Sequence, residues 1–375
     1  MKQGWEIKKL GDVCIINYGT RVVQKKDGGT TYPVYGGGGA TFMIDKYNRE
    51  DCLVVARFAM SPRCVRFVQG KFFLNDSGLS IESSSPMLSQ DLLDKHIIAL
   101  NDKIYSLGKG AAQKNLDINA LKNIDIHFPL SLPEQEKIVS ELDCLSGIIE
   151  KKRQQLKELD AMAQSIFYEM FGDPVTNEKG WEVKKLGEVA IFKNGLNFKK
   201  VETGRKQLFL GVSDFKDKSL ISKVDEYSSI LIDEEFAEEF LLKDGDIVFV
   251  RSNGSKELVG RNVLIYTGNE KIVYSGFCIR CRLMSVDIIP LYANNLLSIP
   301  SIKQVIKAFG RGANISNLNQ EMLGQIPLPL PPLPLQQTFV SKIESIEKQK
   351  GLIKQSIAEV ETLLASRMQY YFEEG

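Results

Sequence analysis

The ten residues GWEIKKLGDV at positions 4–13 return as GWEVKKLGEV at positions 180–189, with eight of the ten residues identical. A second repeated pair lies further along the chain, where GKGAAQKNL begins at Gly108 and GRGANISNL begins at Gly310. In both places an apolar, proline-bearing stretch follows, and then a long charged segment. Repetition at a fixed period indicates a duplicated structural unit. The sequence therefore predicts two copies of one unit.

The two charged segments have the pattern of long helices. In each of them apolar residues recur at alternating spacings of four and three, which is typical of a coiled-coil seam. In the first segment, which starts at Pro133 and has Lys152 as its single polar interruption, the seam residues are Ile138, Leu142, Leu145, Ile149, Leu156, Leu159, Ala163, Ile166 and Met170. In the second segment, which starts at Pro334, they are Phe339, Ile343, Ile346, Lys350, Ile353, Ile357, Val360, Leu364, Arg367 and Tyr371, each 201 residues after a seam position of the first.

We predict that the two helices pair with each other as an antiparallel coiled coil. Pro133 and Pro334 suit the first helical turn, and Gly172 followed by Pro174 suits the end of the first helix. About 37 residues make a rod on the order of 55 Å long. A globular unit then lies at each end, with a pseudo-two-fold axis between them. The alternative is that each helix packs on its own domain, but a strict seam is narrower than the stripe that such packing uses.

The pattern divides the chain into four parts. These are a globular unit of residues 1–130, a helical spacer of residues 131–172, a second globular unit of residues 173–330 and a second helical spacer of residues 331–375. Both globular units mix strand-like segments, such as CLVVARF from Cys52 and GDIVFVRS from Gly245, with helix-like ones, such as SQDLLDKHIIALND from Ser89 and IPSIKQVIKAFG from Ile299. We therefore expect an α/β or α+β fold for each unit. The units resemble each other far less than their framework segments do, which suggests two related tasks with different specificities.

The bulk composition is that of a soluble globular protein. Hydrophobic residues make up 43% and charged residues 25% of the 375 residues. The sequence has no signal peptide and no apolar run long enough to span a membrane, so we expect a cytoplasmic location. The net charge of +1 excludes a global field that would attract nucleic acid, so any such role needs local basic patches. We expect reduced cysteines, and we interpret Cys278 and Cys281 as strand residues because a zinc ribbon needs a second pair.

The sequence has no recognisable catalytic site. Phe209-Leu210-Gly211-Val212-Ser213 lacks the second glycine of a cofactor turn, and Leu330-Pro331-Pro332-Leu333 lacks the polar and aromatic partners of a base-methylation motif. No window fits a phosphate-binding loop, so we expect no ATP-driven motor here. His96 and His127 lie beside apolar runs and are interpreted as packed or surface residues. We therefore predict no catalytic residues and no metal ligands in this chain.

Several loops carry residue types that bind DNA. Arg, Lys, Asn and Gln side chains read base edges, and cations and backbone amides hold phosphates. In the first unit the candidate DNA-binding residues are Tyr35, Gly37, Arg57, Arg63, Arg66, Lys109, Gln113, Lys114 and Asn115. In the second unit they are Arg251, Ser252, Asn253, Lys256, Arg311, Asn314 and Asn317. A solvated polar loop has the same composition, but these clusters recur at matching places in both repeats. Gly36 to Gly39 are interpreted as a tight turn or a close backbone approach.

The order of these motifs resembles the specificity subunit of type I restriction-modification systems across the whole chain. The motifs are W-E-[IV]-K-K-L-G, Y-P-V-Y-G-G-G-G, L-N-D-S-G-L, G-[KR]-G-A, N-L, L-P-x-Q, a long helix and Phe-Gly-Asp-Pro before the second copy. The resemblance implies two target-recognition domains that each read one half of a split DNA site. It also implies that the helical spacers dock two methyltransferase subunits, to which restriction and translocase subunits are added. S-adenosylmethionine, ATP and Mg²⁺ are then expected only on those partners.

Two other functions remain open at this point. A coiled-coil scaffold that binds no DNA explains the helices but not two large units rich in glycine and arginine. A DNA methyltransferase with an unrecognised active site is the third hypothesis, and saturable binding of S-adenosylmethionine to the isolated chain separates it from the other two. If two DNA-reading units are held apart on a rod, we expect their half-sites to lie about one turn of the DNA helix, or about 34 Å, apart.

Overall fold

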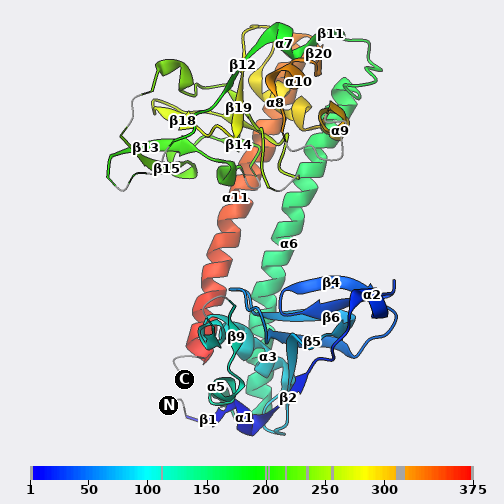
Figure 1. The fold of residues 1–375 in the computed structure, drawn as a ribbon, viewed down its shortest axis with the longest axis vertical. Coiled ribbons are helices and arrows are strands. Elements are labelled where there is room, and N and C mark those ends of the chain that lie inside the picture. Colours follow the sequence, from blue (N-terminus) through cyan, green and yellow to red (C-terminus); the bar gives the residue numbers. More distant parts are fainter. Residues whose placement is uncertain are drawn as a thin grey trace. The chain divides into compact units, whose positions relative to one another are not determined.

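The computed structural model describes residues 3–110, 113–198, 201, 203–215, 218–233, 236–254, 257–309 and 317–372. The chain divides into two compact units, of which unit 1 comprises Met1–Gln155 and Leu352–Gly375 and unit 2 comprises Leu156–Gly351. The two predicted long helices are present as α6, Leu132–Phe171, and α11, Leu333–Phe372 (Figure 1). Each of these helices contributes one part to unit 1 and the other part to unit 2.

Unit 1 is built on a six-stranded sheet with the strand order β2-β7-β5-β6-β3-β4. All of its neighbouring strands are antiparallel except β3 and β6. The strands of unit 1 are Trp5–Lys9 (β1), Cys14–Tyr18 (β2), Tyr32–Gly36 (β3), Gly39–Ile44 (β4), Arg49–Ala56 (β5), Val65–Leu74 (β6), Gly78–Ser83 (β7), Gly108–Lys109 (β8), Asn115–Leu116 (β9) and Asp125–Pro129 (β10). Its shorter helices are Leu10–Val13 (α1), Gln24–Asp27 (α2), Gln90–Ala99 (α3), Asn101–Ser106 (α4) and Ile118–Lys122 (α5).

Unit 2 contains a five-stranded sheet, β12-β19-β16-β17-β14, and a three-stranded sheet, β15-β13-β18. Its strands are Glu182–Lys185 (β11), Ala190–Asn194 (β12), Arg205–Leu210 (β13), Leu220–Ile221 (β14), Ser228–Ile232 (β15), Ile247–Val250 (β16), Asn262–Ile265 (β17), Ile272–Tyr274 (β18), Cys278–Leu283 (β19) and Pro327–Leu330 (β20). Its shorter helices are Leu186–Val189 (α7), Pro290–Ser298 (α8), Pro300–Phe309 (α9) and Gln320–Gly324 (α10), with 3-10 turns at Val212–Asp214, Val224–Glu226 and Glu238–Phe240.

The two units share most of their topology, which agrees with the duplication in the sequence, and unit 2 has β14 in addition. Strand β3 pairs in parallel with the second half of β6, and β13 pairs in the same way with β18. The single long strand β6 of unit 1 therefore corresponds to two strands of unit 2, β17 and β18. This break separates the sheet of unit 2 into its two parts.

The repeated segment GWE[IV]KKLG[DE]V lies where each globular unit joins its long helix. It contributes β1 and α1 in unit 1 and β11 and α7 in unit 2. Strand β1 pairs with β10, and β11 pairs with β20, and both partners lead directly into a long helix. The amides of Leu10 and Leu186 donate to the carbonyls of Ile124 and Ile326, at 2.8 and 2.9 Å. These residues are alike in both copies because they join each globular sheet to its helix.

Within each unit the segments of α6 and α11 contact each other in antiparallel fashion. In unit 1 Glu141 pairs with Arg367, and Arg153 pairs with Glu361. In unit 2 Lys350 pairs with Asp160 at 2.7 Å, and the ring of Phe339 lies 5.6 Å from that of Phe167. In both sets the residue number rises along one helix while it falls along the other. The supercoil and the placement of the two units along a rod stay predictions.

Some of the shorter elements differ from the sequence-based expectation. CVRFV from Cys64 and KFFLND from Lys71 each have the pattern of a separate strand, but they form one continuous strand, β6, because both are paired along the sheet. The helix expected from Ser89 is two helices, α3 and α4, separated at Leu100. The acidic run from Asp233 to Glu239 has the composition of a solvated helix face, but the only helical turn in its described part is the 3-10 turn Glu238–Phe240. Gly37 and Gly38 form a tight turn between β3 and β4, as predicted.

Candidate nucleic-acid interface

In unit 1 three loops meet at the end of β5. The amide of Gly19 donates to the carbonyl of Gly78 at 3.1 Å, which joins the loop after β2 to the turn before β7. The amide of Arg57 donates to the carbonyl of Ser77 at 2.8 Å, and the carbonyl of Arg57 accepts from the amide of Leu116 at 2.9 Å. The backbone of Arg57 is therefore held on both sides by other loops.

Unit 2 has the same set of backbone hydrogen bonds. The amide of Gly195 donates to the carbonyl of Cys278 at 3.1 Å. The amide of Arg251 donates to the carbonyl of Phe277 at 2.8 Å, and its carbonyl accepts from the amide of Leu318 at 2.8 Å. Arg57 and Arg251 thus occupy equivalent positions, although the sequences around them differ. We call the two groups of loops the reading loops: residues 18–20, 57–60, 75–78 and 113–116 in unit 1, and residues 194–196, 251–254, 275–278 and 317–318 in unit 2.

Two glycines make this arrangement of loops fit. A Cβ atom on Gly19 would lie 1.8 Å from the carbonyl oxygen of Asn75, and one on Gly195 would lie 2.2 Å from that of Ser275. No larger residue fits at these positions without moving the backbone. Neither glycine is among the residues predicted from the sequence to bind DNA. Both follow the repeated GWE[IV]KKLG[DE]V segment at the same distance, and that spacing is a signal that identifies them.

The side chain of Arg57 lies between two aromatic rings. Its guanidinium carbon is 4.9 Å from the ring centre of Tyr18 and 4.5 Å from that of Phe58. Both rings reach solvent, with 49% and 38% of these residues exposed. Contact with the faces of the rings orients a guanidinium group without occupying its N–H donors. Arg57 can therefore offer a fixed pair of donors to a phosphate or to a guanine edge.

The remaining candidate DNA-binding residues before position 70 are Tyr35, Gly37, Arg63 and Arg66, and they lie at or near the turn that contains Gly37. One Nη atom of Arg66 donates to the carbonyls of Gly37 and Arg63, at 2.8 and 2.9 Å. The amide of Gly37 donates to Ser77 Oγ at 3.2 Å, which joins this turn to the reading loops. Tyr35 packs against Phe72 in a small core cluster. Arg66 and Tyr35 thus hold the turn in place, whereas Arg63 is exposed.

The candidates on the loop between β8 and β9 lie beside Arg57. Asn115 Oδ1 accepts from the amide of Ala59 at 3.4 Å, and Gln113 is exposed. The ammonium of Lys114 lies 4.2 Å from the ring centre of Tyr105. Lys109 forms an ion pair with Asp117 at 2.6 Å, and this contact lowers the pKa of the Asp117 carboxyl.

In unit 2 the described candidates lie on two adjacent loops. Arg251, Ser252 and Asn253 follow β16 and are half-buried, and Asn317 is exposed next to Leu318. Lys256, Arg311 and Asn314 lie outside the described residues. The hydrogen bond between Leu318 and Arg251 brings the two predicted clusters of this unit together.

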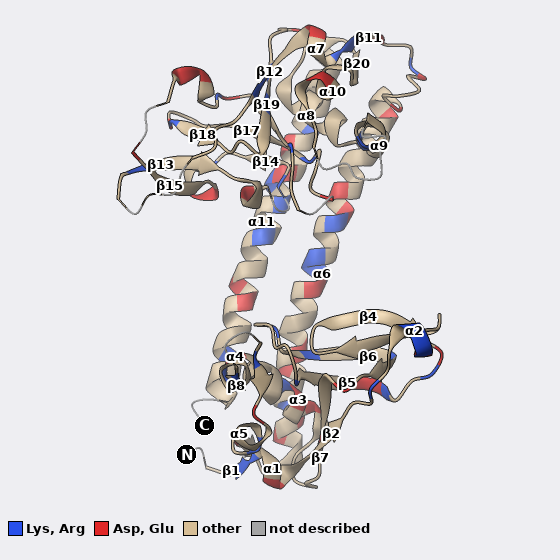
Figure 2. Cartoon of the chain, in the orientation of Figure 1, with Lys and Arg blue, Asp and Glu red and all other residues tan. Residues whose placement is uncertain are grey.

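Charge is distributed locally rather than over one face. Figure 2 shows Lys and Arg interspersed with Asp and Glu in both units and along both long helices. Any attraction for DNA therefore depends on local groups of side chains rather than on a uniform field.

His96 and the two cysteines of β19 are buried and neutral, whereas His127 is half-buried. His96 is 1% exposed, and burial lowers its pKa to about 3. Burial raises the pKa of Cys278 to about 12 and also raises that of Cys281. Both cysteines lie in β19, as the sequence predicts. Among the residues that the structure describes, no three His, Cys, Asp or Glu side chains are placed to hold a metal ion. In the same part of the chain, no helix has the length and apolar content needed to cross a membrane.

A family model named "Type I restriction modification DNA specificity domain" matches the chain twice, over residues 2–160 and 178–362. The chain belongs to this family. It is 27% identical over 261 residues to the type I restriction enzyme StySPI specificity subunit of Salmonella potsdam, a match that covers 65% of the chain and 55% of that protein. It is 27% identical over 292 residues to the EcoKI specificity subunit of Escherichia coli strain K12, which covers 71% of the chain and 60% of that protein. The chain thus spans between half and two thirds of the length of these curated relatives.

Solved structures of the family have the same fold. The crystal structure of a type I restriction-modification S subunit from M. genitalium is similar, with a TM-score of 0.55, 16% identity, and coverage of 99% of this chain and 98% of that chain. A structure described as showing complex assembly and conformational transition of the type I R-M system has a TM-score of 0.53, 17% identity, and coverage of 98% and 97%. The mixed helix and sheet architecture with two similar units, predicted from the repeat, is confirmed.

The predicted seam residues of this specificity-family chain are withdrawn from solvent. Those that are buried are Ile138, Leu142, Ile149, Ile343, Ile346 and Ile357. Those that are half-buried are Leu145, Leu156, Leu159, Ile353, Val360 and Leu364. These side chains are therefore covered, fully or in part, by other residues of the chain. Their role in partner docking stays a prediction.

Proposed function

We propose that this chain is the DNA-reading subunit of a type I restriction-modification complex. Unit 1 reads one half of a bipartite, asymmetric site and unit 2 reads the other half. The observation that carries this proposal is the duplicated set of reading loops, which holds Arg57 and Arg251 by the same backbone hydrogen bonds. The residues around the two arginines differ, since Tyr18 and Phe58 flank the side chain of Arg57, and Phe277 replaces Ser77 as the backbone partner of Arg251. One framework with two sets of side chains suits two half-sites of different sequence.

The chain selects DNA and its partners perform the chemistry. Two methyltransferase subunits dock on the helices α6 and α11 and modify adenine, and added restriction and translocase subunits cleave unmodified DNA. S-adenosylmethionine, ATP and Mg²⁺ are bound by those partners. Membership of the specificity-domain family supports this division of work. The neutral, buried state of His96 and Cys278 is consistent with it.

The decisive experiment is the methylome of cells that express the chain with its methyltransferase subunits. We expect one bipartite motif to be methylated, with two specific halves and a nonspecific spacer between them. A scaffold without DNA recognition gives no motif, and a chain that is itself a methyltransferase gives a motif without added partners. Saturable binding of S-adenosylmethionine to the isolated chain would contradict the proposal directly.

A further inference from the structure

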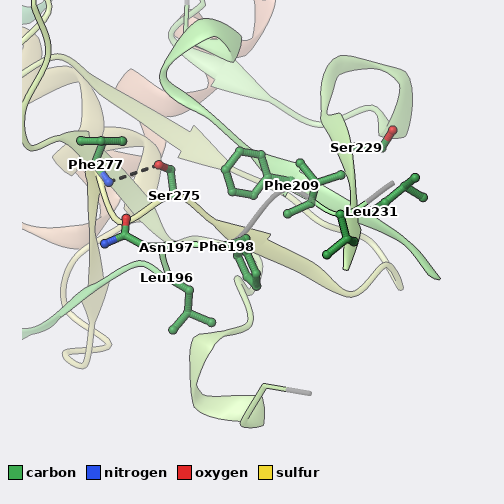
Figure 3. A pocket seen from close by; sticks show the side chains of 10 residues that line it. Leu196, Asn197, Phe198, Phe209, Ser229, Leu231, Ser275 and Phe277 are labelled. Carbon is green, nitrogen blue, oxygen red and sulfur yellow. Dashed lines mark hydrogen bonds between the residues drawn. The ribbon is translucent and has the colours of Figure 1, made fainter. Parts of the chain in front are cut away.

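Unit 2 contains a cavity of about 650 Å³ beside its reading loops. Figure 3 shows three phenyl rings at its wall, those of Phe198, Phe209 and Phe277, together with the amide of Asn197. The size is within the range of about 300 to 1,000 Å³ that is typical of small-molecule pockets. The cavity is therefore large enough for a planar heterocyclic ligand.

The cavity is continuous with the reading loops. The carbonyl of Phe277, one of its lining residues, accepts the hydrogen bond from the Arg251 amide at 2.8 Å. Leu196, another lining residue, donates its amide to the carbonyl of Tyr274 at 2.9 Å. A ligand in the cavity thus contacts a residue that holds the backbone of Arg251, the arginine that we propose to contact DNA.

The chemistry of the lining combines apolar ring surfaces with a few polar groups. The rings of Phe198 and Phe209 meet edge to face with their centres 6.0 Å apart, and Phe277 is 57% exposed. Polar atoms come from Asn197, Ser229 and Ser275, and Ser275 Oγ accepts from the amide of Phe277 at 3.2 Å (Figure 3). Extruded bases are bound in this way, by stacking on aromatic or apolar side chains and by hydrogen bonds at the base edge.

In unit 1 the positions equivalent to two of the lining residues carry side chains that are engaged elsewhere. Val22, at the position equivalent to Phe198, packs with Phe42 against the buried side chains of Val34, Ile44 and Phe73. Ser77 takes the place of Phe277, and its hydroxyl is engaged by Asn75 and by the turn at Gly37. The framework that the two units share does not require a cavity here, so the open cavity belongs to the side chains that are particular to unit 2.

We propose that the cavity of unit 2 receives one nucleobase, extruded from the duplex of the half-site that this unit reads. This inference rests on the proposed function and adds to it a second mode of recognition. A base that leaves the stack loses stacking and pairing, and contact with Phe198, Phe209 and Phe277 offsets this loss. Asn197 offers the donor and acceptor that distinguish one base edge from another. The base is separate from the adenine that the methyltransferase modifies.

The test uses the full chain assembled with its methyltransferase subunits and a duplex that carries the methylated motif. Each base of the second half-site is replaced in turn by a fluorescent analogue: 2-aminopurine for adenine, pyrrolocytosine for cytosine and 6-methylisoxanthopterin for guanine. Thymines are probed by permanganate. We expect the signal at one base, besides that at the methylated adenine, to rise several-fold on binding, because stacking in the duplex suppresses it.

Ser229→Trp fills the cavity from an exposed position of strand β15 and should reduce the rise at that base at least fivefold. The rise at the methylated adenine should remain. Val286→Trp is the matched control, because Val286 is 88% exposed and does not line the cavity. Phe198→Leu removes one ring without adding bulk and should also lower the signal, so the test does not depend on one variant.

The inference is overturned if no second base is extruded while the motif is still methylated. It is also overturned if the extruded base keeps its signal in both Ser229→Trp and Phe198→Leu. Failure of the proposed function has a different signature, because the wild-type complex then shows no preference for any motif.

Discussion

Gln135 and Gln336 make the same three hydrogen bonds at the start of α6 and of α11. Both side chains are fully buried. The oxygen of Gln135 accepts from the amide of Ser89 at 2.8 Å, and its nitrogen donates to the carbonyls of Met87 and Pro129 at 2.6 and 2.7 Å. The glutamine of the L-P-x-Q motif therefore ties the first turn of the helix to two loops of the globular sheet.

The second copy repeats this junction atom for atom. Gln336 accepts from the amide of Ile289 at 2.9 Å and donates to the carbonyls of Asp287 and Pro331, both at 2.9 Å. The L-P-x-Q motif, which marks the resemblance to the family, thus also has a structural function.

Substitution of either glutamine should destabilise its own unit. Gln135→Met and Gln336→Met keep the volume but leave three buried backbone groups without partners, so we expect each to lower the free energy of unfolding by about 3 kcal/mol. Urea denaturation followed by circular dichroism measures this. Gln155→Met, at an exposed position of α6, is the control and should change little. A loss below about 1 kcal/mol in both variants would contradict the prediction.

Gly19→Ala should disrupt the reading loops of unit 1. The added Cβ would lie 1.8 Å from the carbonyl oxygen of Asn75, so the backbone must move. We expect a loss of about 3 kcal/mol in stability, similar to other cases of overpacking, together with loss of selectivity for one half-site. Gly38→Ala is the matched control, because a Cβ there meets nothing within 4 Å. Thermal denaturation and the methylated motif of each variant are the readouts, and equal behaviour of the two variants would refute the prediction.

Arg57→Ala and Arg251→Ala should affect different halves of the target. If each guanidinium contacts a guanine edge or a phosphate of its own half-site, the loss is about 1 to 3 kcal/mol in binding free energy. Each variant serves as the control for the other. Competition binding with duplexes altered in one half at a time measures the effect. An equal loss of selectivity in both halves, or no loss in either, would exclude these arginines as readers.

Asp94→Asn should stabilise unit 1 at neutral pH. Asp94 is 6% exposed, and burial raises the pKa of its carboxyl to about 6. Between about pH 4 and pH 6 the folded chain keeps a proton that the unfolded chain releases, so stability falls as the pH rises through this range. Removal of the charge should restore about 2 to 3 kcal/mol at pH 7 and nothing below pH 4.

Unit 2 already has an amide at the position equivalent to Asp94. Asn294 lies on α8 as Asp94 lies on α3, and it makes hydrogen bonds with Ser219 and Asn262. Melting temperatures of Asp94→Asn at pH 4, 5 and 7 test the prediction, with the exposed Asp12→Asn as control. A gain in stability that does not depend on pH would contradict it.

A change in the length of α6 should alter the spacer of the DNA target and leave its halves unchanged. Insertion or deletion of helical turns between Pro133 and Met170, matched by the same change in α11 to keep the seams in register, alters the separation that the helices impose. Methylome sequencing of these variants reads out the spacer directly. A spacer that does not move would refute the idea that the helices act as a ruler.

The sequence predicted the parts of the fold that have a regular period. The helices α6 and α11 follow from heptads that place Leu142 and Ile343 on one face, and this pattern is independent of the globular units. The reading loops could not be predicted in the same way. The turns Asn75–Gly78 and Ser275–Cys278 share a backbone conformation but little sequence, and they meet Arg57 and Arg251 only through tertiary contacts. Loop composition identified Arg57 and Arg251 as candidates, but only the fold shows that they occupy equivalent positions in the two units.

Unit 1 takes its last elements from the far end of the chain. Phe372 stacks on His96 with ring centres 4.4 Å apart, and Tyr371 belongs to the same core cluster. On the ribosome, unit 2 has all of its residues before those of unit 1 are complete. Protein synthesis proceeds at about 5 to 20 residues per second. The C-terminal segment that completes the core of unit 1 is therefore made roughly 10 to 40 s after the sheet of that unit. Unit 1 of a nascent chain therefore lacks the Tyr371 and Phe372 side chains of its core throughout that interval.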